Sequence, residues 1–179
     1  MLRLVSEVFN MALEPPNGQS QVVDDNNLLT ILEWKIRSIP VRDDPLPSEM
    51  ITEESRTLEL FQLALLVYLK RVSGSSLRQS EKMQSMLNRA FAIFSQIKTC
   101  QRYFPLVIIG CEATTEHDRI VVLDLISRTE NYSYARSLQH MKAIIQSLWA
   151  QDDLSDGVVG YKDKIKAVLS SSETLPSFI

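Results

Sequence analysis

The amino-acid sequence predicts an all-α fold, an irregular multi-helix bundle of about six to eight antiparallel helices. Five segments place apolar residues at steps of three and four, the spacing that lines one face of a helix. No segment shows the sustained alternation of apolar and polar residues that a half-buried strand needs. With 179 residues, of which 45% are hydrophobic and 23% charged, we expect one globular domain over residues 1–179.

The first predicted helix lies near residues 28–38 and carries Trp34. Two segments rich in Pro, Asp and Asn flank this helix, at residues 14–27 and 40–49. Both segments are predicted as loops, because these residue types favour turns over regular helix.

Two longer helices are predicted near residues 52–72 and 79–99. The first is apolar almost all round from Leu58 to Leu69, which is typical of a central helix packed on several sides. The second has a single apolar face, which indicates a helix that lies on the core. The apolar positions of that face are Met83, Met86, Leu87, Ala90, Phe91, Phe94 and Ile97.

Four further helices are predicted near residues 104–113, 116–130, 133–150 and 158–170. Pro105 suits the first turn of its helix, where its missing amide hydrogen costs nothing. Thr115 and Asp118 have the spacing of a capping box, in which side-chain oxygens accept hydrogen bonds from the first free amides of a helix.

The residues Gly-Cys-Glu-Ala at 110–113 end a short apolar helix. Gly110 weakens a helix by roughly 1 kcal/mol relative to Ala. We therefore expect another helix to approach closely there, with the helix at 58–69 as the neighbour. Glu112 needs a partner if it is partly buried. We expect Arg119 to supply it, through two parallel hydrogen bonds across the turn.

The residue types that carry chemistry do not form a pattern that predicts catalysis or metal binding. Cys111 with His117 or His140 is a conceivable nucleophile pair, but no local signature supports it. Three acidic residues follow the order of the DDxxD motif, which holds magnesium-bound diphosphate in isoprenoid cyclases, yet they lie in a predicted turn. These residues are Asp152, Asp153 and Asp156. We expect no catalytic, cofactor-binding or metal-binding residue.

The charge and cysteine content exclude several classes of protein. A net charge of −3 and a pI of about 5.5 argue against nucleic-acid binding by this chain, because such binding needs a surplus of Lys and Arg. Cys100 and Cys111 form no CxxC pair, so neither a disulfide framework nor a zinc module is predicted. No stretch reaches the roughly 18 uninterrupted apolar residues of a membrane span.

Four motifs occur in order between about residues 27 and 165: "LLTILEWKIRSIP", "ELFQLALLVYLKRV", "RYFPLVIIGCEATTEHDRI", and a Trp followed by an acidic residue. This order resembles the C-terminal part of the regulatory domain of fungal zinc binuclear-cluster transcription factors. The matching residues of the last two motifs are Phe104, Pro105, Leu106, Gly110, Cys111, Glu112, Ala113, Asp118, Arg119, Trp149 and Asp152.

The resemblance implies a non-enzymatic, nuclear, all-helical domain that regulates transcription without binding DNA directly. The family's six-cysteine DNA-binding cluster is absent from this chain. Regulation would then act through dimerisation, intramolecular contacts, a coactivator or a small effector. We expect a homodimer or a tight contact with a missing N-terminal half. The alternative is a small helical enzyme, or a lipid- or isoprenoid-handling protein, with a pocket between the helices at 58–69 and 83–97.

Overall fold

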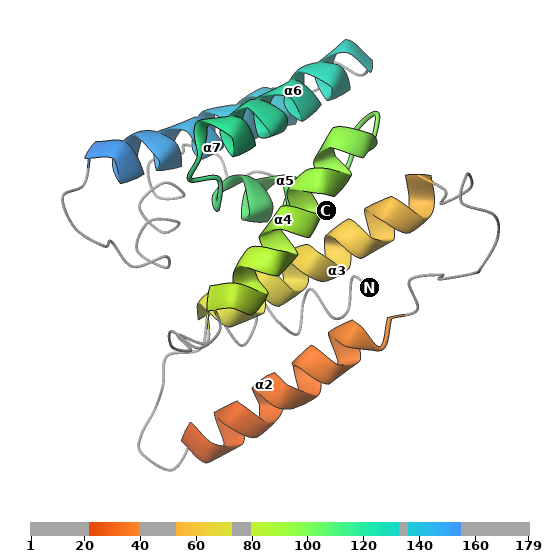
Figure 1. The fold of residues 1–179 in the computed structure, drawn as a ribbon, viewed down its shortest axis with the longest axis vertical. Coiled ribbons are helices and arrows are strands. Elements are labelled where there is room, and N and C mark those ends of the chain that lie inside the picture. The colour runs from red at the N-terminus through yellow and green to blue at the C-terminus, as the bar shows by residue number, and fades with distance from the viewer. Residues whose placement is uncertain (1–21, 40–52, 73–79, 133–135, 155–179) are drawn as a thin grey trace.

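The computed structural model describes residues 22–39, 53–72, 80–132 and 136–154, which fold into six helices and contain no strand (Figure 1). The predicted all-α multi-helix bundle is thereby confirmed. The predicted loop at 40–49, the predicted helix at 158–170 and most of the predicted loop at 14–27 lie outside the described residues. The helices are α2 (Val22–Arg37), α3 (Glu53–Val72), α4 (Ser80–Gln96), α5 (Tyr103–Gly110), α6 (Glu116–Tyr132) and α7 (Arg136–Leu154).

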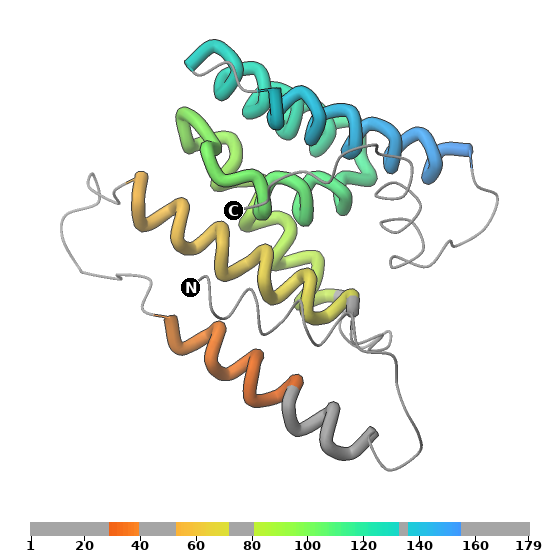
Figure 2. The backbone as a smooth tube through the Cα atoms, turned by 180° about the vertical axis from the view of Figure 1, so that it is seen from behind, coloured from red at the N-terminus to blue at the C-terminus, as the bar shows by residue number. Residues whose placement is uncertain are grey.

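The helices are arranged around the short helix α5. Helix α2 lies at one end of the bundle and the α6–α7 pair at the other, with α3, α4 and α5 between them (Figures 1 and 2). Helices α2 and α3 run antiparallel, and so do α6 and α7. Helix α5 contacts α3, α4, α6 and α7, so it joins the two halves of the bundle.

Helix α3 is the central helix that the sequence predicts. It contacts α2, α4 and α5, and each residue from Ala64 to Leu69 is at most 8% exposed. A helix that is apolar all round needs neighbours on several sides, and α3 has them. None of the described helices combines the length and apolarity that crossing a membrane requires.

The apolar face predicted for α4 is confirmed. Met83 and Met86 are partly buried against the core, and the other five positions of that face are buried. The helix ends at Gln96, short of the predicted end near residue 99. Arg128 of α6 donates hydrogen bonds to the carbonyl oxygens of Phe94, at 3.0 Å, and of Ile97. These bonds supply partners for the last carbonyls of α4 and tie its end to α6.

The bounds of three other helices also differ from the prediction. Helix α5 ends at Gly110, short of the predicted end near residue 113. Helix α2 begins at Val22, so residues 22–27 are helical where a loop was predicted. Asp and Asn are common in first helical turns as well as in loops, and composition alone does not separate the two. Helix α7 continues to Leu154 through the predicted polar turn. Its last turn is held against α6 by an ion pair between Asp153 and Arg119.

Candidate functional site

Most of the residues that the sequence singles out meet at the C-terminal end of α5. This helix is buried from Phe104 to Gly110, so the polar groups at its end need partners within the protein. Those partners come from α3, α6 and α7. We call the resulting cluster the α5 hub, and its members are Arg71, Gly110, Glu112, Ala113, Arg119, Trp149 and Asp153.

Trp149 joins α7 to the end of α5. Its indole Nε1 donates a hydrogen bond of 2.9 Å to the carbonyl oxygen of Gly110, and the residue is 6% exposed. A Cβ atom on Gly110 would lie 3.1 Å from Cδ1 of Ile145 and 3.5 Å from Cγ1 of Val122. The close approach predicted at this glycine is therefore present. The neighbours are side chains of α7 and α6, however, and not the predicted helix at 58–69.

Arg119 covers the ring of Trp149 and bridges the turn after α5 to the end of α7. Its guanidinium carbon lies 5.4 Å from the ring centroid. Its two terminal nitrogens donate to the carboxylate oxygens of Asp153 at 2.8 and 2.7 Å, and Nε donates to the carbonyl oxygen of Ala113 at 3.4 Å. The hydrogen bond between Arg119 and Asp153 is the main cause that raises the pKa of the guanidinium and lowers the pKa of the carboxyl.

The predicted ion pair between Glu112 and Arg119 is wrong. Glu112 pairs with Arg71 at the end of α3: Arg71 Nε donates to Glu112 Oε1 at 2.8 Å, and its Nη2 donates to Oε2. The side chain of Glu112 is 5% exposed and that of Arg71 is 43% exposed. Glu112 therefore turns toward α3, whereas the Trp149 ring and the Asp153 carboxylate hold Arg119 against α7.

Phe104 and Pro105, which the sequence also singled out, lie at the start of α5 and not in the hub. The ring of Phe104 stacks on that of Phe61 of α3, with centroids 6.1 Å apart, and lies edge-on to Tyr68 at 6.3 Å. Pro105, in the first turn, is buried next to Phe104. Aromatic contacts thus hold the start of α5 to α3, and the hub holds its end.

The turn between α5 and α6 contains the remaining predicted residues. Thr115 Oγ1 accepts a hydrogen bond from the amide of Asp118 at 3.1 Å and donates one to Asp118 Oδ2 at 2.7 Å. This confirms the predicted cap of α6. Ala113 is buried and Cys111 is half-buried.

Sequence reasoning missed two members of the hub, Arg71 and Asp153. Arg71 lies in the last turn of the apolar helix α3, next to Lys70. Two basic residues at the end of an apolar helix are a weak signal that a carboxylate lies nearby. Asp153 stands four residues after Trp149, and that spacing places both on one face of a helix. The predicted helix ended at residue 150, so Asp153 was not expected to lie on the same helix as Trp149.

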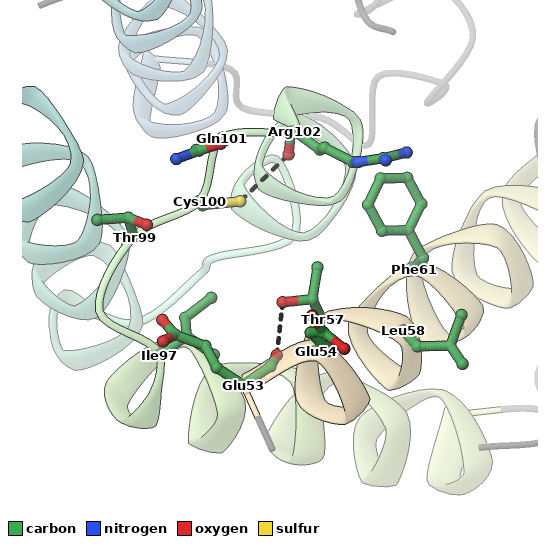
Figure 3. Close-up of a pocket in the computed structure, with 10 residues that line it drawn as sticks. All are labelled: Glu53, Glu54, Thr57, Leu58, Phe61, Ile97, Thr99, Cys100, Gln101 and Arg102. Atoms are coloured by element: carbon green, nitrogen blue, oxygen red, sulfur yellow. Dashed lines mark hydrogen bonds between the residues drawn. The ribbon is translucent and has the colours of Figure 1, made fainter. Parts of the chain in front are cut away.

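A cleft of about 750 Å³ lies outside the hub, between the start of α3 and the segment that follows α4 (Figure 3). A pocket was predicted between the helices at 58–69 and 83–97. The cleft shares only Leu58, Phe61 and Ile97 with these two ranges, so it lies at their edge. The interface between these helices is otherwise filled by buried side chains of both. The cleft is lined by Glu53, Glu54, Thr57, Leu58, Phe61, Ile97, Thr99, Cys100, Gln101 and Arg102.

Cys100 is one of the buried residues that line this cleft. Its Sγ donates to the carbonyl oxygen of Arg102 at 3.1 Å, and its amide donates to Oγ1 of Thr129 at 2.9 Å. Burial raises the pKa of the thiol to about 12. The thiolate is the reactive form of cysteine, so Cys100 is a poor nucleophile at neutral pH.

The acidic residues near the end of α7 do not gather into a metal site in the part of the chain that the structure describes. No group of three or more His, Cys, Asp or Glu is placed there to hold a metal ion. Asp153 binds Arg119 through both carboxylate oxygens. Asp156, the last residue of the DDxxD pattern, lies outside the described residues.

Comparisons with known proteins agree with the order of the motifs. Residues 1–170 match the family described as the fungal specific transcription factor domain. The chain belongs to this family. It is also 36% identical over 182 residues to the transcription factor iacI of Pestalotiopsis fici, a match that covers 100% of this chain and 46% of that protein. The chain thus spans about half the length of this curated relative. No solved structure matches the chain.

In this fungal transcription factor domain, the two cysteines are expected to react differently with iodoacetamide. At about pH 8 the half-buried Cys111 should be alkylated in the folded protein, whereas Cys100 should react at least about tenfold more slowly, because it is buried and protonated. Mass spectrometry of the alkylated peptides measures both rates. In denaturant the two rates should become similar. Equal rates in the folded protein would contradict the burial of Cys100.

Proposed function

We propose that this chain is the non-enzymatic regulatory part of a nuclear fungal transcription factor, and that it acts through protein contacts without binding DNA itself. Its membership of the fungal specific transcription factor domain family supports a role in transcription. Its net charge of −3 supports the absence of direct DNA contact, because DNA binding depends on a surplus of positive charge.

The observation that carries the proposal is an exposed apolar face on α2. Trp34 is 69% exposed and Ile31 is 49% exposed, and they lie about one turn apart on the same side of the helix. The other side buries Leu32 and Ile36 toward α3, the one described helix that α2 contacts. Exposed tryptophans are frequent anchors of protein interfaces. We assign this face to contact with a second copy of the chain.

The environments of two reactive side chains support a non-enzymatic role. Burial keeps the Cys100 thiol protonated at neutral pH, so it lacks the activation that a nucleophile needs. Asp153, a candidate metal ligand in the sequence, is engaged by Arg119. Both side chains contribute to packing or to ion pairing between helices.

Sedimentation velocity at micromolar concentration tests the dimer. We expect a dimer for the unchanged chain and a monomer for Trp34→Ala, because this substitution removes the largest exposed side chain of the face. Tyr132→Ala is the matched control: Tyr132 is 72% exposed on α6, and its loss should leave the dimer intact. A monomeric unchanged chain, or a dimer that survives Trp34→Ala, would contradict this use of α2.

A reporter assay tests the role in transcription. The chain is fused to a heterologous DNA-binding domain, and we expect the fusion to change reporter expression relative to that DNA-binding domain alone. Trp34→Ala should weaken the change, and Tyr132→Ala should preserve it. Fluorescence anisotropy with duplex DNA checks the other half of the proposal. Tight binding that falls steeply as salt is added would show direct DNA contact and contradict it.

A further inference from the structure

The open cleft between α3 and the segment after α4 is large enough to hold a small molecule. Its volume of about 750 Å³ falls within the roughly 300–1,000 Å³ that is typical of ligand pockets. Leu58, Phe61 and Ile97 supply an apolar lining, and charged side chains stand around them (Figure 3). No member of the α5 hub lines the cleft, and neither does the exposed face of α2.

Arg102 is the positive group of the cleft. Its guanidinium carbon lies 5.8 Å from the ring centroid of Phe61, and the side chain extends over this ring (Figure 3). A guanidinium that contacts a ring through a cation–π interaction uses none of its N–H groups in that contact, so they remain available for hydrogen bonds. Among the described residues these edges have no hydrogen bond or ion pair. A planar guanidinium of this kind matches a carboxylate through two parallel hydrogen bonds.

The negative groups of the cleft are Glu53 and Glu54, in the first turn of α3. They lie across the cleft from Arg102 (Figure 3). Oε1 of Glu53 accepts a hydrogen bond of 2.9 Å from the amide of Lys98, which fixes this side chain at the wall. A carboxylate that accepts one hydrogen bond has acceptor sites left for a ligand. Glu54 is exposed, so its carboxylate is accessible from solvent.

The two signs of charge decide the class of ligand. Arg102 would attract a simple anion, but the two glutamates would repel it. The glutamates would attract a simple cation, but Arg102 would repel it. A molecule that carries both a carboxylate and an ammonium group satisfies both sides. An apolar body can lie against Leu58, which is partly exposed, whereas Phe61 and Ile97 are almost fully buried. We propose that this cleft binds a small zwitterion of the amino-acid class with an apolar side chain. The biological meaning of such binding, as a signal to a regulatory domain, rests on the proposed function.

Isothermal titration calorimetry with four amino acids tests the proposal. L-leucine, L-methionine, L-phenylalanine and L-tryptophan are each titrated into the full chain, and we expect saturable binding of at least one. The analogue of the best binder that lacks the ammonium group, and the analogue that lacks the carboxylate, should each bind at least about tenfold more weakly. Absence of saturable binding for all four, or equal binding of the three related molecules, would overturn the proposal.

Variants locate the site. Arg102→Gln and Glu54→Gln should each weaken binding of the best amino acid at least about tenfold, because each loses one charged partner. Arg102→Lys, which keeps the charge but loses the planar fork, should bind with intermediate affinity and also serves if Arg102→Gln does not fold. Arg136→Gln on α7, outside the cleft, is the matched control and should bind like the unchanged chain. Binding that persists in both Arg102→Gln and Glu54→Gln would place the ligand elsewhere and overturn the proposal.

The binding assay and the reporter assay test the two proposals separately. A chain that binds an amino acid in the cleft but leaves the fused reporter unchanged retains this site and contradicts the proposed function. A chain that alters the reporter but binds none of the four amino acids retains the proposed function and contradicts this site.

Discussion

Replacing Trp149 by alanine is expected to destabilise the domain by about 3–5 kcal/mol. The indole is buried where α5 and α7 meet, and its removal leaves a cavity that the surrounding helices can fill only in part. The carbonyl oxygen of Gly110 also loses one of its two donors and keeps the amide of Ala113, and Arg119 loses the ring that it covers. Urea denaturation followed by circular dichroism measures the free energy of unfolding and compares it with that of the unchanged chain.

Two control variants separate the parts of this effect. Trp149→Phe keeps most of the buried apolar volume but loses the indole N–H, so it should cost about 1 kcal/mol, because the carbonyl of Gly110 keeps only the hydrogen bond of 3.2 Å from the amide of Ala113. Tyr132→Ala removes an exposed aromatic side chain outside the α2 face and should change the free energy of unfolding by at most about 0.5 kcal/mol. If Trp149→Ala were as mild as Tyr132→Ala, Trp149 would not hold α5 to α7.

The helices could be predicted because their signal is local. The spacing of apolar residues in α4 indicates directly which face is buried, and the apolar stretch of α3 from Leu63 to Leu69 indicates that several neighbours surround it. The cap formed by Thr115 and Asp118 depends on residues three apart, so the sequence alone specifies it. The bounds of α2 and α7 were less certain, because Asp and Asn suit both loops and helical turns.

The partners within the α5 hub could not be predicted in the same way, because they depend on how the helices pack. Arg119 lies near Glu112 in the sequence, yet it binds Asp153, which is 34 residues away. Glu112 binds Arg71, which is 41 residues away. Short separation along the chain favoured the wrong pair. The packing of α6 and α7 against each other and against α5 brings Arg119 to Trp149 and Asp153 instead.

Arg71→Ala is expected to destabilise the domain by about 2–4 kcal/mol, because it leaves the carboxylate of Glu112 without its partner. The side chain of Glu112 is 5% exposed, so water replaces the lost hydrogen bonds poorly. The 43% exposure of Arg71 places the effect below that of a fully buried ion pair. Thermal and urea denaturation of the single variants Arg71→Ala and Glu112→Gln, and of the double variant, give the coupling energy between the two residues.

The same coupling decides which of two arginines, Arg71 or Arg119, pairs with Glu112. The double variant should be more stable than the sum of the single effects predicts, because each single variant strands a group that the double variant removes. Arg89→Ala is the matched control: Arg89 also makes two hydrogen bonds to a glutamate, Glu59, whose side chain is 20% exposed, so its loss should cost at most about 1 kcal/mol. Arg119→Ala combined with Glu112→Gln should be additive, since these residues bind different partners. Strong coupling between Arg119 and Glu112, with none between Arg71 and Glu112, would support the ion pair predicted from the sequence. It would contradict the ion pair between Arg71 and Glu112 in the α5 hub.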